Sequence, residues 1–492
     1  MFLIQKKCEH KNSRYKTRLP KKMLFTQPRI TIGALKGGSG KTILSLGLIA
    51  AWREKGHRIA PFKKGPDFID AGWLTFAAAR SCHNLDPFMM SNEQIVQSFI
   101  NHSGDTDLSL IEGNRGLFDG LDVEGRCSTA ELAKLLKTPV ILIVDVTMAT
   151  RTVAAVIKGC QAFDPDLNIA GIILNRVAGS RQEALITNAI EKYCDTIVVG
   201  SVPKLQDTIF PERHMGLLPY QEREHAEKAI SWTRETVEKH LQLDAIWKIA
   251  SEVEGIEIKF QSQKTGTTVK VGNDSPQIGF IRDKAFWFYY PENLEQLERM
   301  GARLFEINAI SQNVLPQLDA LYIGGGFPEI QAQALADNHT FRNALREEIE
   351  KGLPVYAECG GFMYLGKNLV VDGRTYPMVG AIPIEFVLKK RPQGHGYTVL
   401  EVNEPNPYYP VGEILKGHEF HYSNPVLTGE ANVDFVFKVR RGHGVDGGRD
   451  GICMKNVLAT FTHIHAAGNP RWAKGLLKAS LEYRRSNSRK NG

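Results

Sequence analysis

The sequence has few cysteines, and they are not spaced as a structural framework would require. No Cys-x-x-Cys pair occurs and the number is odd, which argues against a set of paired disulfides and against a zinc ribbon. We therefore expect a protein of the reducing cytoplasm. The seven cysteines stand at positions 8, 82, 127, 160, 194, 359 and 453.

Long apolar runs are missing as well. No stretch approaches the roughly 20 apolar residues that a membrane-spanning helix needs. Residues 1–28 carry charges throughout, where a signal peptide would need a continuous apolar segment. We expect neither membrane insertion nor secretion.

Beyond its first residues, the chain also lacks an excess of positive charge. The formal net charge is +7, and residues 1–28, with eight Lys or Arg and one acid, account for all of it. The remainder is formally neutral, so no nucleic-acid partner is indicated. We expect residues 1–28 to form a basic disordered tail without an assigned role.

The body of the chain has the length and pattern of more than one α/β domain. Its 492 residues, of which 42% are hydrophobic and 23% charged, exceed what a single core usually supports. Short apolar runs alternate with helical spacers, which is typical of a mostly parallel, doubly wound sheet. The expected strands of the first domain lie at 29–33, 108–111, 140–144, 169–174 and 197–199.

A second series of apolar runs begins at residue 277, and the sequence after Met378 is rich in β-formers. Between the two series, residues 221–260 predict helices that pass over the surface, and residues 261–275 are polar and rich in turn formers. We find no internal repeat. We therefore expect a tail at 1–28, a first domain at 29–230, a helical connector at 231–275 and a second domain at 276–485.

A glycine-rich loop separates the first expected strand from a predicted helix at 42–55. In such a loop the backbone N–H groups point at a phosphate, and a lysine neutralises the terminal phosphates. Leu35 replaces the usual first glycine and a second lysine precedes the glycines, so the loop resembles the variant found in ParA, MinD and dethiobiotin synthetase. We predict ATP binding by Lys36, Gly37, Gly38, Ser39, Gly40, Lys41 and Thr42.

Magnesium bound with the nucleotide needs carboxylates near strand ends, and three acidic clusters are available. Asp67 and Asp70 lie in a Gly-Pro-Asp-Phe-Ile-Asp segment, Glu112 follows an apolar strand, and Asp119 lies in a Phe-Asp-Gly turn. Such turns can aim acids into a cleft at the carboxyl ends of strands. We predict Mg²⁺ ligands at Thr42, Asp67 and Glu112, and nucleotide contacts at Asp67, Asp70 and Asp119.

Cys359 in the second domain has the setting of a nucleophile. It follows an apolar run at 353–356 and precedes two glycines and a helix-like segment at 362–368, the order of a nucleophile elbow. Glycines 324–326 offer backbone donors for an oxyanion, and His463, which ends a late apolar stretch, is the expected base. A nucleotide site together with a reactive cysteine indicates glutamine-dependent amidation.

The other histidines leave a metal site open as a weaker alternative. His418, His421 and His465 could supply nitrogens together with His463. Their spacing lacks the His-Glu-x-x-His pattern, and no cysteine pair completes a zinc set. Polar or substrate contacts are therefore favoured. The cationic run at 389–391 is left unassigned, because such runs are usually solvated.

Ordered motifs cover nearly everything after the tail, and together they resemble those of the cobyrinic acid and hydrogenobyrinic acid a,c-diamide synthases. The resemblance implies an N-terminal domain like dethiobiotin synthetase, a C-terminal class I glutamine amidotransferase domain and a route for ammonia between them. Cys359 then matches the glutaminase nucleophile and His463 its general base. The motifs lie at 61–70, 84–87, 111–113, 116–120, 211–214, 283–286, 289–293 and 324–329.

The resemblance further implies a ligase that uses MgATP and L-glutamine to amidate the a and c acetates of a corrinoid, by way of an acyl phosphate, in cobalamin biosynthesis. Its partners would be this tetrapyrrole polycarboxylate and glutamine, and it would be a monomer or homodimer. The sequence departs from the usual glutaminase triad, because His465 stands where an acid two residues after the base would orient it. What orients His463 stays open.

Two alternative functions also stay open. The amidase that acts on nickel sirohydrochlorin in coenzyme F430 biosynthesis shares these motifs, so the macrocycle is not fixed. A regulatory ATPase like ParA or MinD would use the same loop without chemistry on a small molecule. Two features argue against the regulatory ATPase. It does not explain the cysteine-bearing half of the chain, and the sequence has no amphipathic terminal membrane helix.

Overall fold

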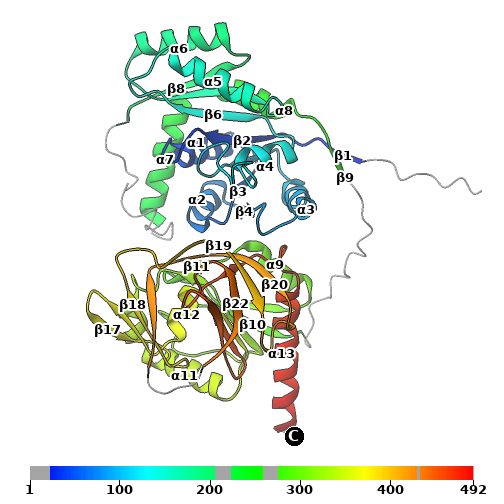
Figure 1. Cartoon of the computed structure of the whole chain (residues 1–492), viewed down its shortest axis with the longest axis vertical. Helices are drawn as coiled ribbons and strands as arrows, with labels where there is room; N and C mark the ends of the chain where they lie inside the picture. The colour runs from blue at the N-terminus through cyan, green and yellow to red at the C-terminus, as the bar shows by residue number, and fades with distance from the viewer. Residues whose placement is uncertain (1–22, 206–222, 259–274, 429–432, 491–492) are drawn as a thin grey trace, which may run out of the picture.

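The computed structural model describes residues 23–205, 223–258, 275–428 and 433–490. Within them, the chain forms two α/β units that lie one above the other along the long axis of the molecule (Figure 1). The expected α/β class is therefore confirmed. Residues 1–22 of the tail, the motif at 211–214 and all but the last residue of the stretch at 261–275 lie outside the described residues.

The first unit is built on a sheet of seven parallel strands in the order β4-β3-β5-β2-β6-β7-β8. Strands β2, β3 and β5 are buried along their whole length, as expected for central strands with helices on both faces. All five expected strands are present. The bounds are β2 Arg29–Ala34, β3 Ile59–Lys64, β4 His83–Leu85, β5 Leu108–Glu112, β6 Val140–Asp145, β7 Ile169–Val177 and β8 Ile197–Pro203.

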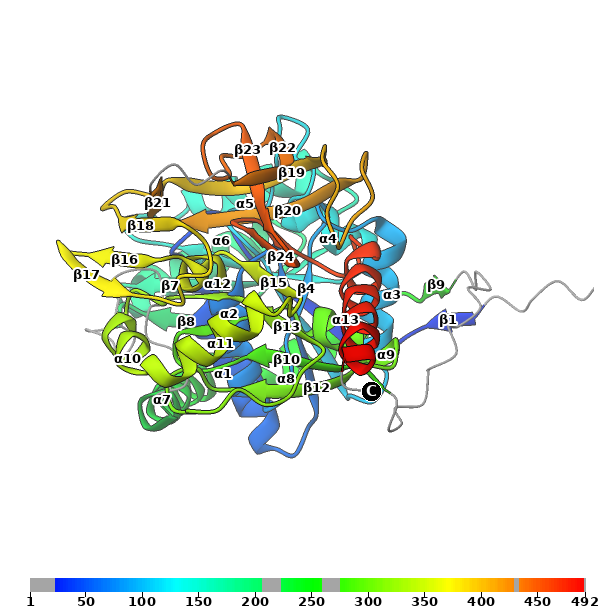
Figure 2. The same ribbon diagram turned by 90° about the horizontal axis from the view of Figure 1, so that it is seen from below.

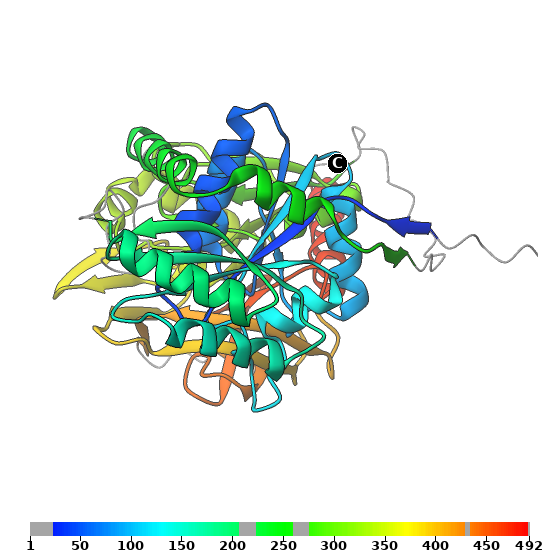
Figure 3. The ribbon, with the colours of Figure 1, turned by 90° about the horizontal axis from the view of Figure 1, so that it is seen from above.

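The helices of the first unit bury their apolar residues in three clusters: one with α1, α2, α7 and α8, one with α4, α5 and α6, and a third that contains α3. Figure 3 views this blue-to-green unit from above. None of the helices among the described residues is long and apolar enough to cross a bilayer. The bounds are α1 Lys41–Glu54, α2 Phe68–Ala78, α3 Asn92–Ser103, α4 Thr129–Leu135, α5 Thr152–Phe163, α6 Ser180–Tyr193, α7 Arg223–His240 and α8 Leu243–Ser251.

The polar sequence of α7 predicts a helix that passes over the surface, but one face of this helix is packed against the core. Ala226, Ala229 and Val237 are buried in the cluster that contains α1. The two helices approach closely at Gly47, where a Cβ atom would lie 2.4 Å from the carbonyl oxygen of Thr233. The apolar residues of α7 are few and mostly small, so its sequence resembles that of a surface helix although one face is packed.

Part of the segment expected to be a tail is ordered in a strand. Residues 23–25 form β1 (Met23–Phe25), which pairs antiparallel with β9 (Ile256–Ile258). This pairing ties the start of the described chain to the segment that follows α8.

The second unit is built on a mixed sheet of ten strands in the order β12-β10-β13-β15-β24-β23-β22-β19-β20-β25. The first five strands run parallel, and every later pair is antiparallel. The bounds are β10 Gln277–Ile281, β12 Arg303–Ile307, β13 Ala320–Ile323, β15 Val355–Glu358, β19 Gly394–Val402, β20 Ile414–His421, β22 Asp434–Arg441, β23 Arg449–Met454, β24 Val457–Thr460 and β25 His463–Ile464.

This sheet curls. Only residues 461 and 462 separate β24 from β25, yet β25 pairs with β20 at the far end of the strand order. Strand β20 must therefore return to the end of β24, and His418 then lies opposite His463. Because β24 also pairs with β15, the curl brings both histidines to the end of the strand that precedes Cys359.

Helix α13 packs on this sheet through Trp472 and Leu476, and it lies along one flank in Figures 1 and 2. Smaller strands complete the second unit as the pair β11–β14 and the four-stranded sheet β17-β16-β18-β21. The bounds are β11 Phe286–Phe288, β14 Gly325–Gly326, β16 Asn368–Val371, β17 Arg374–Pro377, β18 Ile384–Leu388, β21 Ser423–Leu427, α9 Pro291–Arg299, α10 Ala332–Asp337, α11 His339–Glu350, α12 Gly360–Leu365 and α13 Arg471–Lys490.

Candidate functional site

The glycine-rich loop joins β2 to α1, as the sequence predicts. Gly38 and Gly40 have φ values of 69° and 93°, a region that residues with side chains rarely adopt. A Cβ atom at Gly40 would also lie 2.7 Å from Asn175 Nδ2 on β7. The loop ends at the N-terminus of α1, where free N–H groups favour a phosphate.

Lys41 and Thr42 turn toward the segment that ends β5. Thr42 Oγ1 donates a hydrogen bond of 2.8 Å to Glu112 Oε1, and Lys41 Nζ donates one of 2.8 Å to the carbonyl of Arg115. Burial, together with the nearby ammonium of Lys63, lowers the pKa of Lys41. The structure thus brings three of the predicted residues together at one end of the sheet.

Lys63, which belongs to the motif at 61–70 but is not among the predicted site residues, lies at the centre of the acidic cluster. Its buried ammonium is 2.6 Å from Asp70 Oδ2 and 2.8 Å from Glu112 Oε1. Burial alone would lower the pKa of Lys63, but Asp70 and Glu112 more than offset this and raise it. Two lysines at the end of a strand that is otherwise apolar and buried are the signal that could have identified it.

One carboxylate oxygen of the acidic cluster, Glu112 Oε2, is available to bind a cation. Glu112 is fully buried, and among the described residues its Oε2 has no hydrogen-bond partner. A buried carboxylate oxygen without a partner is costly. With the hydroxyl of Thr42 it forms the type of oxygen set that Mg²⁺ takes, so the residues present fit a magnesium ion brought with the nucleotide.

The other residues predicted for the nucleotide site make different contacts. Asp67 caps α2 by accepting a hydrogen bond of 2.8 Å from Asp70 N, and burial next to Asp70 raises the pKa of Asp67 to about 6. Asp119 accepts a bond of 2.9 Å from a backbone N–H of its own turn. The exposed Lys36 points to Asp145, with Nζ 3.4 Å from Oδ2.

Cys359 has the strained geometry expected of a nucleophile elbow. Its φ of 46° and ψ of −101° lie outside the regions that residues with side chains favour, and α12 begins immediately after it. The buried thiol donates to the carbonyl of Phe420 at 3.6 Å. Burial and the nearby carboxylate of Glu329 raise the pKa of this thiol, so it needs a base to become a nucleophile.

His463 is held by the residue that precedes the nucleophile. Its Nδ1 lies 3.2 Å from Glu358 Oε2, and both side chains are buried. His465, which stands where the usual acid would be, turns elsewhere: its Nε2 lies 3.4 Å from Glu292 Oε2 on α9. The Ala-Glu-Cys-Gly-Gly segment contains Glu358, but nothing local in the sequence shows that its side chain meets a histidine 105 residues away.

The glycines at 324–326 lie close to both His463 and the elbow at Cys359. A Cβ atom at Gly325 would lie 3.0 Å from His463 Nε2, and one at Gly360 would lie 3.0 Å from Gly326 N. Any side chain at Gly325 would displace the imidazole.

The two candidate sites meet at the contact between the units. The ring of Phe68, at the start of α2, lies edge-on to His463 with centroids 5.1 Å apart. It also packs on Tyr290 at 4.4 Å and on His418 at 5.6 Å. The Tyr290 hydroxyl donates to the carbonyl of Pro66 at 3.2 Å. A residue next to Asp67 therefore touches the base of the thiol site.

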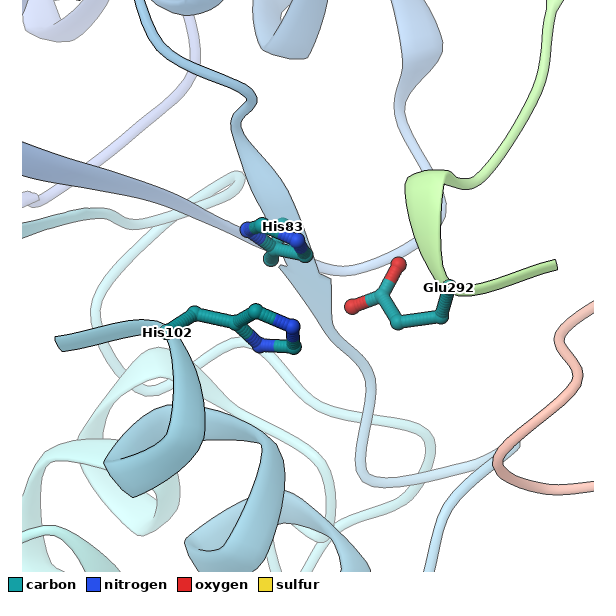
Figure 4. A group of neighbouring side chains, drawn as sticks. All are labelled: His83, His102 and Glu292. Atoms are coloured by element: carbon teal, nitrogen blue, oxygen red, sulfur yellow. The ribbon is translucent and has the colours of Figure 1, made fainter. Parts of the chain in front are cut away.

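A second cluster joins the units beside this contact (Figure 4). His83 and His102 of the first unit and Glu292 of the second have ligand atoms within 4.8 Å of one another, and they form the one group of metal-ligand type among the described residues. The two imidazole rings stack with centroids 3.5 Å apart and an angle of 14°. The nitrogen lone pairs lie in the planes of the rings. In two stacked rings they are nearly parallel, so they do not converge on one metal ion. Each Nε2 instead lies 3.0 Å from an oxygen of Glu295, so the two imidazoles bridge the units by hydrogen bonds to one carboxylate.

The weaker metal alternative is not supported by geometry. His418 Nδ1 contacts the Tyr290 hydroxyl at 3.2 Å, and His421 Nδ1 contacts the carbonyl of Ser423 at 3.0 Å. Within the described ranges, these histidines form no group at metal-ligand distance. They line the curled end of the sheet.

Comparison with known protein families and sequences agrees with this division. A CobQ/CobB/MinD/ParA nucleotide binding domain matches residues 30–218, and a CobB/CobQ-like glutamine amidotransferase domain matches residues 277–471. Among solved structures, a glutamine amidotransferase covers 42% of this chain and 98% of its own, with 22% identity and a TM-score of 0.32, which is too low to carry an argument.

Curated relatives named cobyrinate a,c-diamide synthase match nearly the whole chain. The relative from Magnetococcus marinus is 40% identical over 457 residues, which are 93% of this chain and 98% of the relative. The one from Archaeoglobus fulgidus is 40% identical over 92% of this chain and 98% of its own. The one from Listeria innocua is 38% identical, over 90% and 97%. The chain contains a nucleotide-binding domain followed by a glutamine amidotransferase domain. It is a ligase and belongs to the cobyrinate a,c-diamide synthase family.

Proposed function

We propose that this enzyme uses ATP and glutamine to amidate the a and c acetate carboxylates of cobyrinic or hydrogenobyrinic acid in cobalamin biosynthesis. The names of its full-length relatives support this substrate. The observation that carries the proposal is the contact of Phe68, the neighbour of Asp67, with His463. Ammonia released at one site and used at the other requires such a shared interface.

The nucleotide half would activate the carboxylate. Thr42, Asp67 and Glu112 would hold the magnesium ion, which supplies positive charge to the phosphates. Lys41 would stabilise the transferring phosphoryl group, and Lys36 would do so after leaving Asp145. An acetate oxygen attacks the γ-phosphorus while ADP leaves, and the product is an acyl phosphate.

The thiol half would release ammonia. His463 Nε2 takes the proton of Cys359, the sulfur attacks the carboxamide carbon of glutamine, and ammonia leaves. Backbone N–H groups of the loop at 324–326 would stabilise the oxyanion, and water then frees glutamate from the thioester. Ammonia crosses near Phe68 and attacks the acyl carbon, so that phosphate leaves and an amide remains. Two rounds give the diamide.

We also propose revised domain limits. The synthetase domain would extend through α7 and α8 to about Ser251, because their apolar residues belong to its core. The amidotransferase domain would begin at residue 276, just before β10, and run to residue 485.

The substrate is tested by mass spectrometry of products formed with MgATP and glutamine from cobyrinic acid, hydrogenobyrinic acid and nickel sirohydrochlorin in competition. Two amidations of a corrinoid are the expected result. Turnover of only the nickel tetrapyrrole would assign the enzyme to the F430 pathway. ATP hydrolysis without any amidation, stimulated by DNA or lipid, would favour a regulatory ATPase.

The division of labour is tested by Cys359→Ala. Glutamine-driven amidation is expected to fall by at least about 10³-fold, because the covalent nucleophile is lost. Amidation driven by added ammonium salt is expected to stay within about threefold of the wild type, because the nucleotide half is intact. Loss of both activities with normal ATP binding would contradict the proposal.

A further inference from the structure

We infer that Glu358 is the positioning residue that orients His463, in place of the acid that this chain lacks two residues after the base. The inference rests on the proposed glutaminase reaction and adds a residue to it. Glu358 Oε2 lies 3.2 Å from His463 Nδ1, and both residues are almost completely buried. An ionised carboxylate only accepts hydrogen bonds, so Nδ1 carries the proton and Nε2 is free to act as the base.

Two further donors contact the carboxylate of Glu358. The Tyr322 hydroxyl donates to Oε2 at 3.1 Å, and the backbone N–H of Ile464 donates to Oε1 at 3.4 Å. Burial raises the pKa of Tyr322 well above its ordinary value, so this hydroxyl keeps its proton and remains a donor. Two donors besides the imidazole compensate the buried charge.

The network continues into the motif at 289–293. Asn293 Nδ2 donates to the Tyr322 hydroxyl at 3.2 Å and to the carbonyl of Ile464 at 3.0 Å, and its Oδ1 accepts from Ala466 N at 2.7 Å. Asn293 thus fixes both the tyrosine that supports Glu358 and the strand that carries His463.

His465 cannot replace Glu358 in this role. Its Nδ1 accepts a hydrogen bond of 3.2 Å from Ala467 N, so in the neutral ring the proton is on Nε2, which faces Glu292 at 3.4 Å. The acid that the usual triad supplies after the base is here supplied by the strand residue before the nucleophile. The pairing of Glu358 with Thr460 on β24 brings it beside the segment that leads to His463.

The test is Glu358→Gln, which keeps the shape but removes the charge. The kcat for glutamine hydrolysis is expected to fall at least about 10²-fold, with KM for glutamine within about threefold, because a misoriented base affects the transition state more than substrate binding. Ammonia-driven amidation is expected to be unchanged. Glu358→Asp keeps the charge but places it one methylene farther away. Its kcat for glutamine hydrolysis is expected to lie between that of Glu358→Gln and that of the wild type.

A second readout does not depend on the macrocycle. Without the carboxylate the imidazolium is less stable, and it stabilises the Cys359 thiolate less. The acid limb of the pH profile for Cys359 alkylation is therefore expected to move to higher pH in Glu358→Gln, by about one pH unit or more. Tyr322→Phe removes one donor to Glu358 and is expected to lower glutamine kcat by only about three- to tenfold. Asp283→Asn, which replaces another buried acid bonded to backbone amides, is the matched control and should leave glutamine kcat within about threefold.

Three outcomes would overturn the inference: glutamine kcat within threefold of wild type in Glu358→Gln, an unchanged alkylation profile, or equal loss of glutamine-driven and ammonia-driven activity. The last outcome would make Glu358 a purely structural residue. If the wild type releases glutamate but forms no amide from any macrocycle, the proposed substrate fails while the role of Glu358 is still decided by the glutaminase assay.

Discussion

The Lys63 ammonium is held in the interior by two carboxylates, Asp70 and Glu112. Burying one charge is expensive, and a buried group of three charges is tolerated only while all its members are present. The cluster has a net negative charge, and the free oxygen of Glu112 leaves room for a cation. The two carboxylates explain why the Lys63 side chain can be buried in β3.

Lys63→Met is expected to lower the free energy of unfolding by about 3–5 kcal/mol, because Glu112 would be left fully buried without its partner and Asp70 would also lose its ion pair. Urea denaturation measures the change. Lys64→Met, one residue later on the same strand, is the matched control. Lys64 has no ion pair within 4 Å among the described residues, and burial lowers its pKa, so this change is expected to cost less than about 1 kcal/mol. Equal losses in the two variants would contradict the proposed cluster.

Helix α1 connects the phosphate loop to the core of the first unit, and helix α7 packs against α1. The contact between the two helices depends on Gly47, which sits under the backbone of Thr233. Both helices have apolar residues at helical spacing, and the sequence predicts both to be helical. Which faces meet depends on the space at one glycine, and a hydrophobic pattern does not encode that.

Gly47→Ala is expected to destabilise the protein by about 1–3 kcal/mol, since its Cβ would lie 2.4 Å from Thr233 O and from Val237 Cγ2. The control is Gly159→Ala in α5, where nothing lies within 4 Å of the new Cβ. That change is expected to stabilise by up to about 1 kcal/mol, because alanine favours a helix. Thermal unfolding of the two variants should therefore show Tm shifts of opposite sign. Shifts of the same sign would refute this description of the α1–α7 contact.

In the whole molecule, the two units are joined by an aromatic contact around Phe68 and by the hydrogen bonds of His83 and His102 with Glu295. Phe68 is the first residue of α2, whose cap is Asp67, and its ring rests on His463. A shift at the start of α2 would therefore reach His463, the proposed glutaminase base, through a direct contact.

Phe68→Ala is expected to uncouple the two reactions. Removing the ring leaves a cavity between His463 and the start of α2, from which ammonia can escape to solvent. The ratio of glutamate released to amide formed, measured with both substrates present, should rise severalfold above that of the wild type, while saturating ammonium salt restores amidation.

Phe88→Ala is the matched control, because Phe88 also stacks across the interface, on Tyr397 at 4.3 Å, but through a separate contact. Its ratio should stay near the wild-type value. A similar rise in both variants would mean that any loosening of the interface uncouples the enzyme, and no specific role would remain for Phe68.

The sequence by itself determined the α/β class, five of the seven parallel strands of the first unit, the phosphate loop and the elbow at Cys359, because each depends on local periodicity or on residues a few positions apart. Tertiary structure decided the contacts between distant residues: Lys63 with Glu112, Glu358 with His463, and Phe68 with His463. It also decided that α7 is packed rather than superficial. These features depend on strand register, on the curl of the second sheet and on the fit between two surfaces, and those are set by the packing of the whole chain.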